Sequence, residues 1–413
     1  MDSLYNFLIS KKSENLAFSS TIRENAIETY KKLPLPVKKQ EDWKYSDLSN
    51  LFDIEYNEVA NNFETNLFKI ESKNKLVFIN GCLKSELSNF NNKDIEIIPI
   101  SENAVATNLS IEYINKSNNL DNKFSALNTA FANNGVIIKF KKNNALSEPL
   151  VIEYINNSKV ATFENTKNII IAEEGSVSEV IEIHSNKDLC MLTSNIVTNI
   201  FVNENASIDY TILQTEKECV KINSHYVHQY KNSKFTAHTF QLDGNLIRNN
   251  LIINHENTHC ETSLNGIFFP IANQHFDNFT IVNHTNEHCT TNENYRGLAN
   301  DSGVGIFTGK IFVAKGAQKT LAQQSNKNIV LSNKAKIHSK PQLEIYADDV
   351  SCSHGSTTGQ IDKDALFYCQ SRGISKQDAL KLLINAFLVT NIRLIKHKEI
   401  ATFVEEKINL KLA

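Results

Sequence analysis

The stretch LIINHENTHCET (residues 251–262) is followed by TIVNHTNEHCTT (residues 280–291), and the shared pattern recurs after 29 residues. In each stretch a β-branched run leads into an Asn-His pair and then a His-Cys pair. A repeat of this length predicts a β-solenoid, in which each coil buries its apolar face by stacking on its neighbours. A β-sandwich also has short strands, but it gives no reason for this pattern to recur.

Similar strand pairs continue through roughly residues 135 to 350. Each pair consists of a β-branched or aromatic run, a turn rich in Asn, Gly or Lys, and a second run. Asn tolerates left-handed backbone, so we expect it to replace Gly at many turns. We take one position at the start of each second run as equivalent, with steps of 31, 27, 25, 29 and 31 residues: Val177, Ile208, Phe235, Cys260, Cys289 and Thr320.

The amino-terminal segment is predicted to be helical. Thr21 and Glu24 fit a capping box, apolar residues follow at helical spacing, and Pro34 ends the run. The segment EDWKYSDL (residues 41–48) holds the single tryptophan, and its function is not legible from its residues. From there to about residue 95 we expect irregular structure.

The carboxy-terminal segment is predicted to form three helices. Asp362 is placed to cap the first helix and Gly373 to end it. Ser375 with Asp378 opens the second helix, and residues 400–408 belong to a third.

The predicted fold class is therefore mainly β, with a parallel β-helix core between two helical domains. We assign residues 1–95 to an N-terminal helical and irregular domain, residues 96–355 to the β-helix, and residues 356–413 to a C-terminal helical domain.

Composition excludes several function classes. With 413 residues, 41% hydrophobic and 22% charged, the sequence is that of an ordinary globular protein. A net charge of −3 gives no general reason to bind nucleic acid or an anionic membrane. The first residues lack an export signal, and no segment approaches 18 uncharged apolar residues. We therefore expect a cytoplasmic protein.

The cysteines are odd in number, scattered and without a Cys-x-x-Cys pair, which disfavours a disulfide framework and a zinc knot within one chain. The seven are Cys82, Cys190, Cys219, Cys260, Cys289, Cys352 and Cys369. Cys260 and Cys289, with the repeated histidines, resemble a metal ladder. Stacking of equivalent residues in successive coils explains that repeat without a metal, and we favour it. The histidines are His255, His259, His284 and His288.

The densest chemistry lies in DDVSCSHGSTTG (residues 348–359). If this segment is extended, Cys352 and His354 point to the same face, where a thiolate and an imidazole can share one metal ion. The alternative is a buried thiol beside a histidine bonded to a carboxylate such as Asp348. An iron-sulfur cluster or a tetrahedral site generally takes four ligands. Unless distant residues complete the shell, the remaining ligands come from another subunit.

We find no sequence support for an autonomous enzyme. The stretch GVGIFTGK (residues 303–310) resembles a phosphate loop, but its first glycine is misplaced and Ile311 stands at the Ser/Thr position. A catalytic triad order, an HExxH motif and a dinucleotide fingerprint are all missing from the sequence.

The chain resembles the SufB/SufD family of iron-sulfur cluster assembly proteins, and within it most resembles SufD. The matching motifs are PQLEI (341–345), ADDVSCSHG (347–355), TGQ (358–360), LFY (366–368) and SRGI (371–374), with weaker support from EDWKY (41–45) and FSALNTAF (124–131).

The resemblance implies a right-handed parallel β-helix and a non-catalytic scaffold. The implied partners are a SufB-like paralogue, which pairs with the end of the β-helix, and a SufC-like ABC ATPase, which docks on the C-terminal helices and supplies the ATPase activity. Cys352 and His354 would hold iron or a nascent iron-sulfur cluster transiently at the paralogue interface. The isolated chain would hold no cluster and would be able to form a homodimer.

Three alternatives remain open, and the first is a purely structural subunit whose partner supplies all of the ligands. SufB-like chains are longer and carry an acidic residue before the histidine of a block such as LEHEATTSK, whereas this chain reads Cys-Ser-His-Gly. Cys369 resembles SufB more than SufD, and we expect a buried thiol there. A carbohydrate-active β-helix enzyme is an alternative of another class, but it needs carboxylates gathered along a groove.

Overall fold

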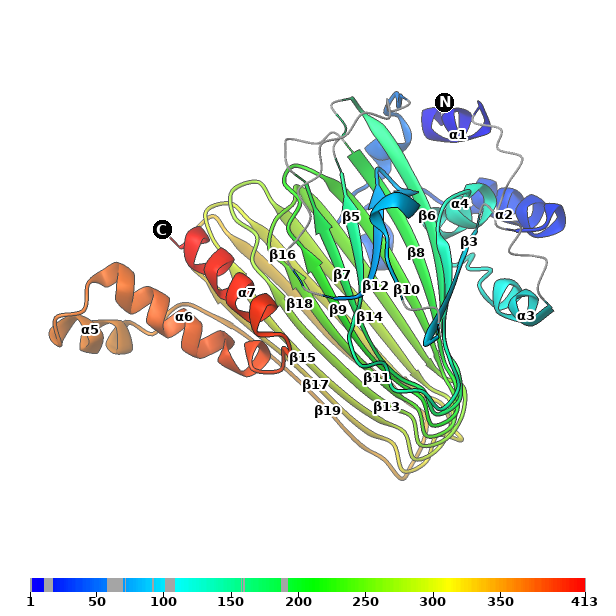
Figure 1. The fold of residues 1–413 in the computed structure, drawn as a ribbon. Coiled ribbons are helices and arrows are strands. Elements are labelled where there is room, and N and C mark those ends of the chain that lie inside the picture. The colour runs from blue at the N-terminus through cyan, green and yellow to red at the C-terminus, as the bar shows by residue number, and fades with distance from the viewer. Residues whose placement is uncertain are drawn as a thin grey trace.

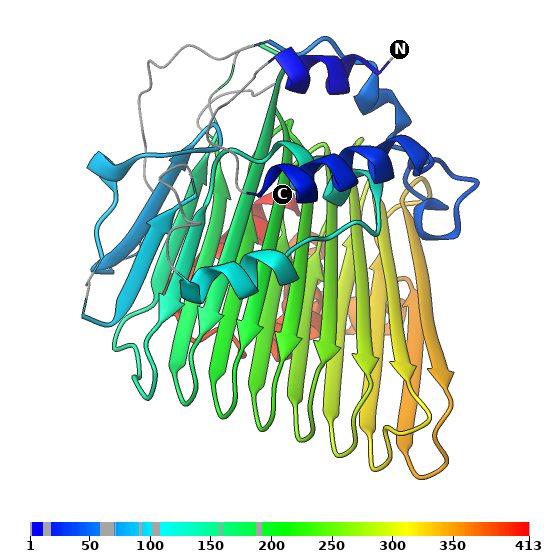
Figure 2. The same ribbon diagram turned by 90° about the vertical axis from the view of Figure 1, so that its right-hand side faces the viewer.

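The computed structural model describes residues 2–10, 18–57, 70, 72–90, 93–100, 108–156, 158, 160–186 and 192–412. Its core is a parallel β-helix in which successive strands alternate between two facing sheets (Figures 1 and 2). The predicted fold class is thereby confirmed. Within the described ranges, no helix is both long and apolar enough to cross a membrane.

Sheet 1 contains ten strands among the described residues. In spatial order it runs β19 (Ser351–Gly359), β17 (Leu321–Val330), β15 (Thr290–Ala299), β13 (Glu261–Phe268), β11 (Lys234–Gln241), β9 (Ser207–Gln214), β7 (Val177–Ser185), β5 (Leu150–Ile155), β1 (Asn74–Ile79) and β2 (Cys82–Leu83).

Sheet 2 contains nine described strands. It runs β18 (Lys336–Ile345), β16 (Val304–Val313), β14 (His275–His284), β12 (Leu246–His255), β10 (Val220–Gln229), β8 (Leu192–Val202), β6 (Thr162–Ala172), β4 (Val136–Phe140) and β3 (Ile95–Pro99). The strands predicted from the repeat are all present. The region before residue 95, which we expected to be irregular, instead contributes β1 and β2 to sheet 1.

The pairing register corrects the predicted alignment of the coils. Ile208 and Phe235 are paired as expected. Val177 precedes the residue that pairs in this column by one position, and Cys260, Cys289 and Thr320 precede theirs by two. The alignment had followed the His-Cys pairs, which lie in turns of variable length and not in strands. The true column steps by 27 to 31 residues and consists of Ser178, Ile208, Phe235, Thr262, Thr291, Ala322 and Cys352.

The turns entering sheet 1 explain the repeated residues. Two residues before each of six strands the backbone is left-handed, with φ between 55° and 68°: Gly175, Asn205, Asn232, His259, His288 and Lys319. Asn replaces Gly at two of these positions, as predicted, while His or Lys takes the left-handed conformation at three others. The next residue is small and buried in every coil: Ser176, Ala206, Ser233, Cys260, Cys289 and Thr320. Cys260 and Cys289 thus occupy one column of turn residues.

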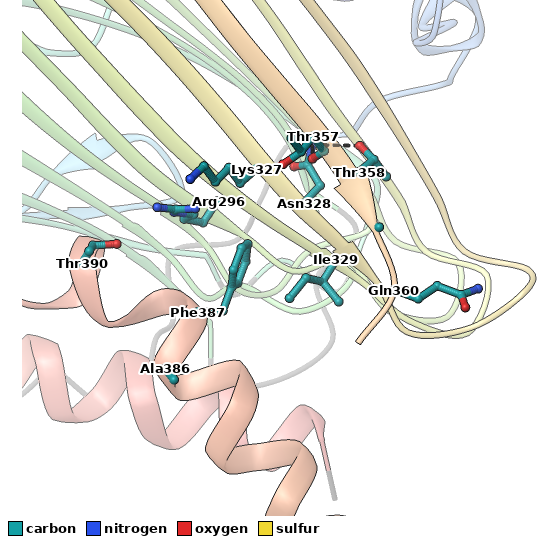
Figure 3. Close-up of a pocket in the computed structure, with 11 residues that line it drawn as sticks. Arg296, Lys327, Asn328, Ile329, Thr357, Thr358, Gln360, Ala386, Phe387 and Thr390 are labelled. Carbon is teal, nitrogen blue, oxygen red and sulfur yellow. Dashed lines mark hydrogen bonds between the residues drawn. The ribbon is translucent and has the colours of Figure 1, made fainter. Parts of the chain in front are cut away.

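The helices cover the outer faces of the two sheets. Apolar residues of α6 and α7 pack on sheet 1, while α2 and α4 pack beside sheet 2 (Figures 1 and 2). A pocket lies between α6 and the last strands of sheet 1 (Figure 3). The helices are α1 (Ser3–Ser10), α2 (Ser20–Lys32), α3 (Asn108–Lys116), α4 (Lys123–Phe131), α5 (Lys363–Ser371), α6 (Lys376–Ile392) and α7 (Lys398–Lys411).

The helix caps were largely predictable. Asp362 and Ser375 accept backbone hydrogen bonds at the starts of α5 and α6, and Gly373 ends α5 with φ of +84°. The predicted cap of α2 was wrong, because Ser19 occupies the N-cap position and Thr21 lies inside the helix. Both residues are hydroxyl-bearing, so the sequence pattern does not separate them.

Residues 41–48 form a strap across sheet 2. The Arg248 guanidinium lies 4.2 Å from the centre of the Trp43 ring, and the rings of Tyr45 and His338 stack with centroids 4.3 Å apart. Cation–π and stacking contacts of this kind stabilise the docked segment. The strap therefore ties the N-terminal region to β18, the last strand of sheet 2.

Adding one methyl group at Gly266 tests how closely successive coils of the β-helix pack. Gly266 pairs with Tyr295 in the next coil, and a Cβ at Gly266 would lie 2.1 Å from Tyr295 Cε1. We expect Gly266→Ala to lower the free energy of unfolding by about 1–3 kcal/mol through overpacking. Urea denaturation measures this difference. The control is Gly316→Ala, where a Cβ has no neighbour within 4 Å; equal losses in both variants would contradict the tight stack.

Candidate functional site

Cys352 and His354 lie on β19, the terminal strand of sheet 1. Their register partners in β17 are Ala322 and Gln324, both buried and facing the interior. Cys352 and His354 therefore face the same side of β19, as alternation in a strand requires. No described strand pairs with the outer edge of β19, so Cys352 is half-buried and His354 is exposed.

The Cys352 thiol rests on apolar neighbours. It packs against a buried cluster that includes Ile311, Ala322 and Ala347. Burial raises the pKa of the Cys352 thiol, and a backbone hydrogen bond with Ala322 partly offsets this effect. A bound metal cation would reverse this preference, because the thiolate is the form that ligates metals.

The residues beneath His354 form a buried polar chain. Gln324 Nε2 donates to Glu293 at 2.6 Å, and Thr280 Oγ1 donates to the other carboxylate oxygen at 2.6 Å. Burial raises the pKa of Glu293 to about 7. The Gln324 Oε1 atom is buried without a hydrogen-bond partner among the described residues, so it is available to a group above it.

The alternative role for His354 is not supported by the contacts. Within the part of the chain that the structure describes, His354 forms no hydrogen bond or ion pair with Asp348, and Asp349 pairs with Lys319. The structure also brings no three His, Cys, Asp or Glu side chains together for a metal ion among the described residues. A metal ion bound by Cys352 and His354 would thus need further ligands.

The repeated histidines and cysteines make the contacts of a stacked column. His255 and His284 lie with their Nδ1 atoms 3.2 Å apart, and Thr262 and Thr291 bond their Nε2 atoms at 2.8 and 2.9 Å. The rings of His259 and His288 stack 4.9 Å apart. The sulfur atoms contact backbone carbonyl oxygens, for example Cys260 Sγ to Asn257 O at 3.1 Å, and Cys289 also forms side-chain hydrogen bonds with Cys260, His255 and His284. These partners account for the repeat without a metal.

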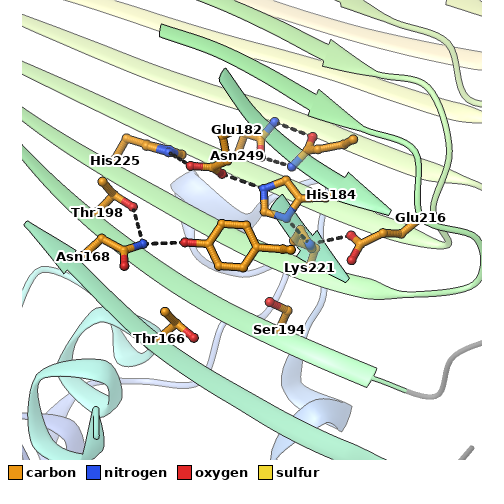
Figure 4. A network of polar contacts seen from close by, with 12 residues as sticks. Thr166, Asn168, Glu182, His184, Ser194, Thr198, Glu216, Lys221, His225 and Asn249 are labelled. Atoms are coloured by element: carbon orange, nitrogen blue, oxygen red, sulfur yellow. Dashed lines mark hydrogen bonds and ion pairs between the residues drawn. The ribbon is translucent and has the colours of Figure 1, made fainter. Parts of the chain in front are cut away.

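The sequence analysis missed a charged network inside the β-helix (Figure 4). His184 Nε2 lies 2.6 Å from Glu182, its Nδ1 lies 2.6 Å from Lys221, and Lys221 pairs with Glu216 at 2.5 Å. Burial disfavours the Glu182 charge, but His184 and His225 outweigh it and hold the pKa of Glu182 well below its usual value. The network joins sheet 1 to sheet 2.

This network could have been found from the sequence only by aligning the coils in their correct register. Glu182 and His184 occupy inward positions of β7, and Lys221 occupies an inward position of β10. Without the correct alignment of coils, residues separated by nearly 40 positions are not seen as neighbours.

The C-terminal helices leave an aromatic surface exposed. Phe367 and Tyr368 on α5 are 72% and 58% exposed, and α5 projects away from the sheets (Figure 1). Cys369 beside them is buried, as predicted. Exposed neighbouring aromatic residues are typical of protein interaction sites.

Comparisons with known proteins agree with this architecture. Residues 154–387 match the family described as SUF system FeS cluster assembly, SufBD core domain, and residues 6–152 match the SufBD protein N-terminal region. An iron-sulfur cluster assembly SufBD family protein of Synechocystis is 29% identical over 387 residues, covering 88% of this chain and 85% of the relative.

Two relatives bear the name iron-sulfur cluster assembly protein SufD. The Escherichia coli protein is 37% identical over 151 residues, which are 37% of this chain and 36% of the relative. The Bacillus subtilis protein is 34% identical over 116 residues, which are 27% of this chain and 26% of the relative.

The raised pKa of Glu293 predicts a pH-dependent stability. Its ordinary pKa is 4.5 and its folded-state pKa is about 7, so the folded state binds more protons between these values. The free energy of unfolding therefore falls as pH rises through this window. The stabilisation of the native chain relative to Glu293→Gln should decrease by on the order of 2–3 kcal/mol from pH 4 to pH 8.

Urea denaturation at both pH values measures this change. Glu405→Gln on α7 is the control, because Glu405 is exposed and its replacement should leave the pH profile unaltered. The raised pKa of Glu293 would be contradicted if the native chain and Glu293→Gln differed in free energy of unfolding by the same amount at pH 4 and pH 8.

Proposed function

Because this chain belongs to the SufB/SufD family of iron-sulfur cluster assembly proteins, we propose that it is a SufD-like scaffold subunit that offers Cys352 and His354 to iron or a nascent cluster. The iron or cluster is the cargo of assembly and is held transiently. The observation that carries the proposal is the placement of both donors on one face of β19, which no further coil of the described residues covers.

The open end of the β-helix supports a partner at this position. β18 and β19 are the last strands of their sheets, and their outer edges have no strand partner among the described residues. Unpaired strand edges favour pairing with another chain. A SufB-like paralogue stacked on this end would bring the missing ligands to Cys352 and His354, and it would exclude water from the bound iron.

The C-terminal helices are the proposed docking surface for a SufC-like ABC ATPase. α6 and α7 are anchored on sheet 1 by buried residues such as Ile384 and Val404, whereas Phe367 and Tyr368 on α5 stay exposed. A movement of the ATPase would thus be transmitted through α6 to β13 and β15 of sheet 1. In this proposal the ATPase activity belongs to the partner, and this chain is a non-catalytic cytoplasmic subunit.

The family match favours cluster assembly over a carbohydrate-active enzyme. Within the family, relatives named SufD favour the SufD-like assignment over the SufB-like one. In the absence of a paralogue, the same open end would allow two copies of this chain to form a homodimer.

The first test removes both donors. In a complex reconstituted with the paralogue and the ATPase, Cys352→Ala combined with His354→Ala should reduce iron and acid-labile sulfide by about tenfold or more, since loss of metal-site interactions has effects of this size. Complex assembly should be intact, because the unpaired backbone edges of β18 and β19 and the C-terminal helices, which make the proposed partner contacts, are unchanged.

Ser353→Ala is the matched control, because Ser353 lies between the two donors on the opposite face of β19. Undiminished cluster yield in the double variant, with normal assembly, would reject the ligand role.

The second test addresses the docking surface. Phe367→Ala combined with Tyr368→Ala should weaken ATPase binding by about tenfold or more, because exposed aromatic residues often dominate interfaces. Calorimetric titration measures the Kd. Leu410→Ala on α7 is the control, as Leu410 is 71% exposed but lies on another helix. An equal Kd for both variants would place the docking surface elsewhere.

A further inference from the structure

The pocket between α6 and the last strands of sheet 1 has a volume of about 470 Å³ (Figure 3). This volume is in the range of small-molecule sites. Two of its lining residues are cationic and none is acidic. The residues that line the pocket are Arg296, Lys327, Asn328, Ile329, Thr357, Thr358, Gly359, Gln360, Ala386, Phe387 and Thr390.

The two cations lie side by side, and the described residues that line the pocket include no acidic side chain. Arg296 on β15 pairs in register with Lys327 on β17, so both side chains leave the outer face of sheet 1 at adjacent positions. Neither forms an ion pair with any residue that the structure describes. Like charges directly opposite each other on neighbouring strands are destabilising. An anion between them would relieve that repulsion.

The Arg296 guanidinium is held in place but is not saturated with hydrogen bonds. Its carbon lies 5.1 Å from the centre of the Phe387 ring on α6. Its Nε atom is buried and has no hydrogen-bond partner among the described residues. A buried, unpaired donor of this kind carries a free-energy penalty that a bound acceptor removes.

The remaining lining divides into a polar side and an apolar side. Thr357 follows the same outward alternation as Lys327 and lines the pocket with a hydroxyl group, and the Thr390 hydroxyl, which donates to Asn391 Oδ1 at 3.4 Å, lies on the α6 side. Ile329 and Phe387 line the pocket with apolar surface.

We propose that this pocket binds a small organic oxyanion. Its phosphate or carboxylate group lies between Arg296 and Lys327, and its apolar part lies against Ile329 and Phe387. The ligand contacts both α6 and the end of β19, so it fixes the C-terminal helices relative to the last coil. This site is separate from Cys352 and His354, and it does not depend on the cluster assembly proposal.

The test is calorimetric titration of the full chain with phenyl phosphate, benzoate and inorganic phosphate at constant ionic strength. Phenyl phosphate or benzoate should bind saturably, and the tighter of the two identifies the anionic group. Inorganic phosphate should bind more weakly than phenyl phosphate, because it leaves Ile329 and Phe387 uncovered. Lys327→Gln and Arg296→Gln should each weaken binding by about tenfold or more.

Lys376→Gln is the matched control, because Lys376 is an exposed cation on α6 outside the pocket, and it should retain native affinity. Because Arg296 also packs on Phe387, circular dichroism checks that Arg296→Gln is folded. If it unfolds, the affinity of Lys327→Gln alone tests the proposal, since Lys327 is exposed. The proposal is overturned if neither organic probe binds saturably, or if Lys327→Gln binds as tightly as the native chain.

Discussion

The structure depends on the in-register stacking of parallel coils. Each inward side chain lies on the equivalent side chain of the preceding coil, as in the column that joins Ile208, Phe235, Thr262 and Thr291. Backbone hydrogen bonds fix this register, and close packing then limits the residue that fits at each level. The C-terminal helices α6 and α7 depend on this stack, because their apolar faces are buried against the outer face of sheet 1.

The candidate metal ligands lie at the level where the stacking of coils ends. In every earlier coil the positions equivalent to Cys352 and His354 are buried by the next coil, but β19 has no successor among the described residues. An inward-facing thiol and imidazole are therefore accessible only at this level. A neighbouring chain that continues the stack would bury them again, and it would do so with its own ligands in reach. The geometry thus links metal binding to assembly.

Much of this arrangement follows from local sequence rules. The strand–turn–strand repeat, the Asn turns, the caps at Asp362 and Ser375, and the shared face of Cys352 and His354 all depend on neighbours in the sequence. The exact alignment of coils does not, because turn length varies and the conspicuous His-Cys pairs lie in the turns. The network around His184 and the pocket beside Arg296 were missed for that reason, since both join residues that only the three-dimensional register brings together.

The bound iron can be located by anomalous X-ray diffraction at the iron absorption edge, on iron-loaded crystals of the complex formed with the paralogue and the ATPase. We expect an iron peak at the junction of the two β-helices, within bonding distance of both Cys352 Sγ and a ring nitrogen of His354, with further ligands from the partner. An iron peak elsewhere in the complex, with Cys352 and His354 covered by apolar or unrelated contacts, would contradict this expectation.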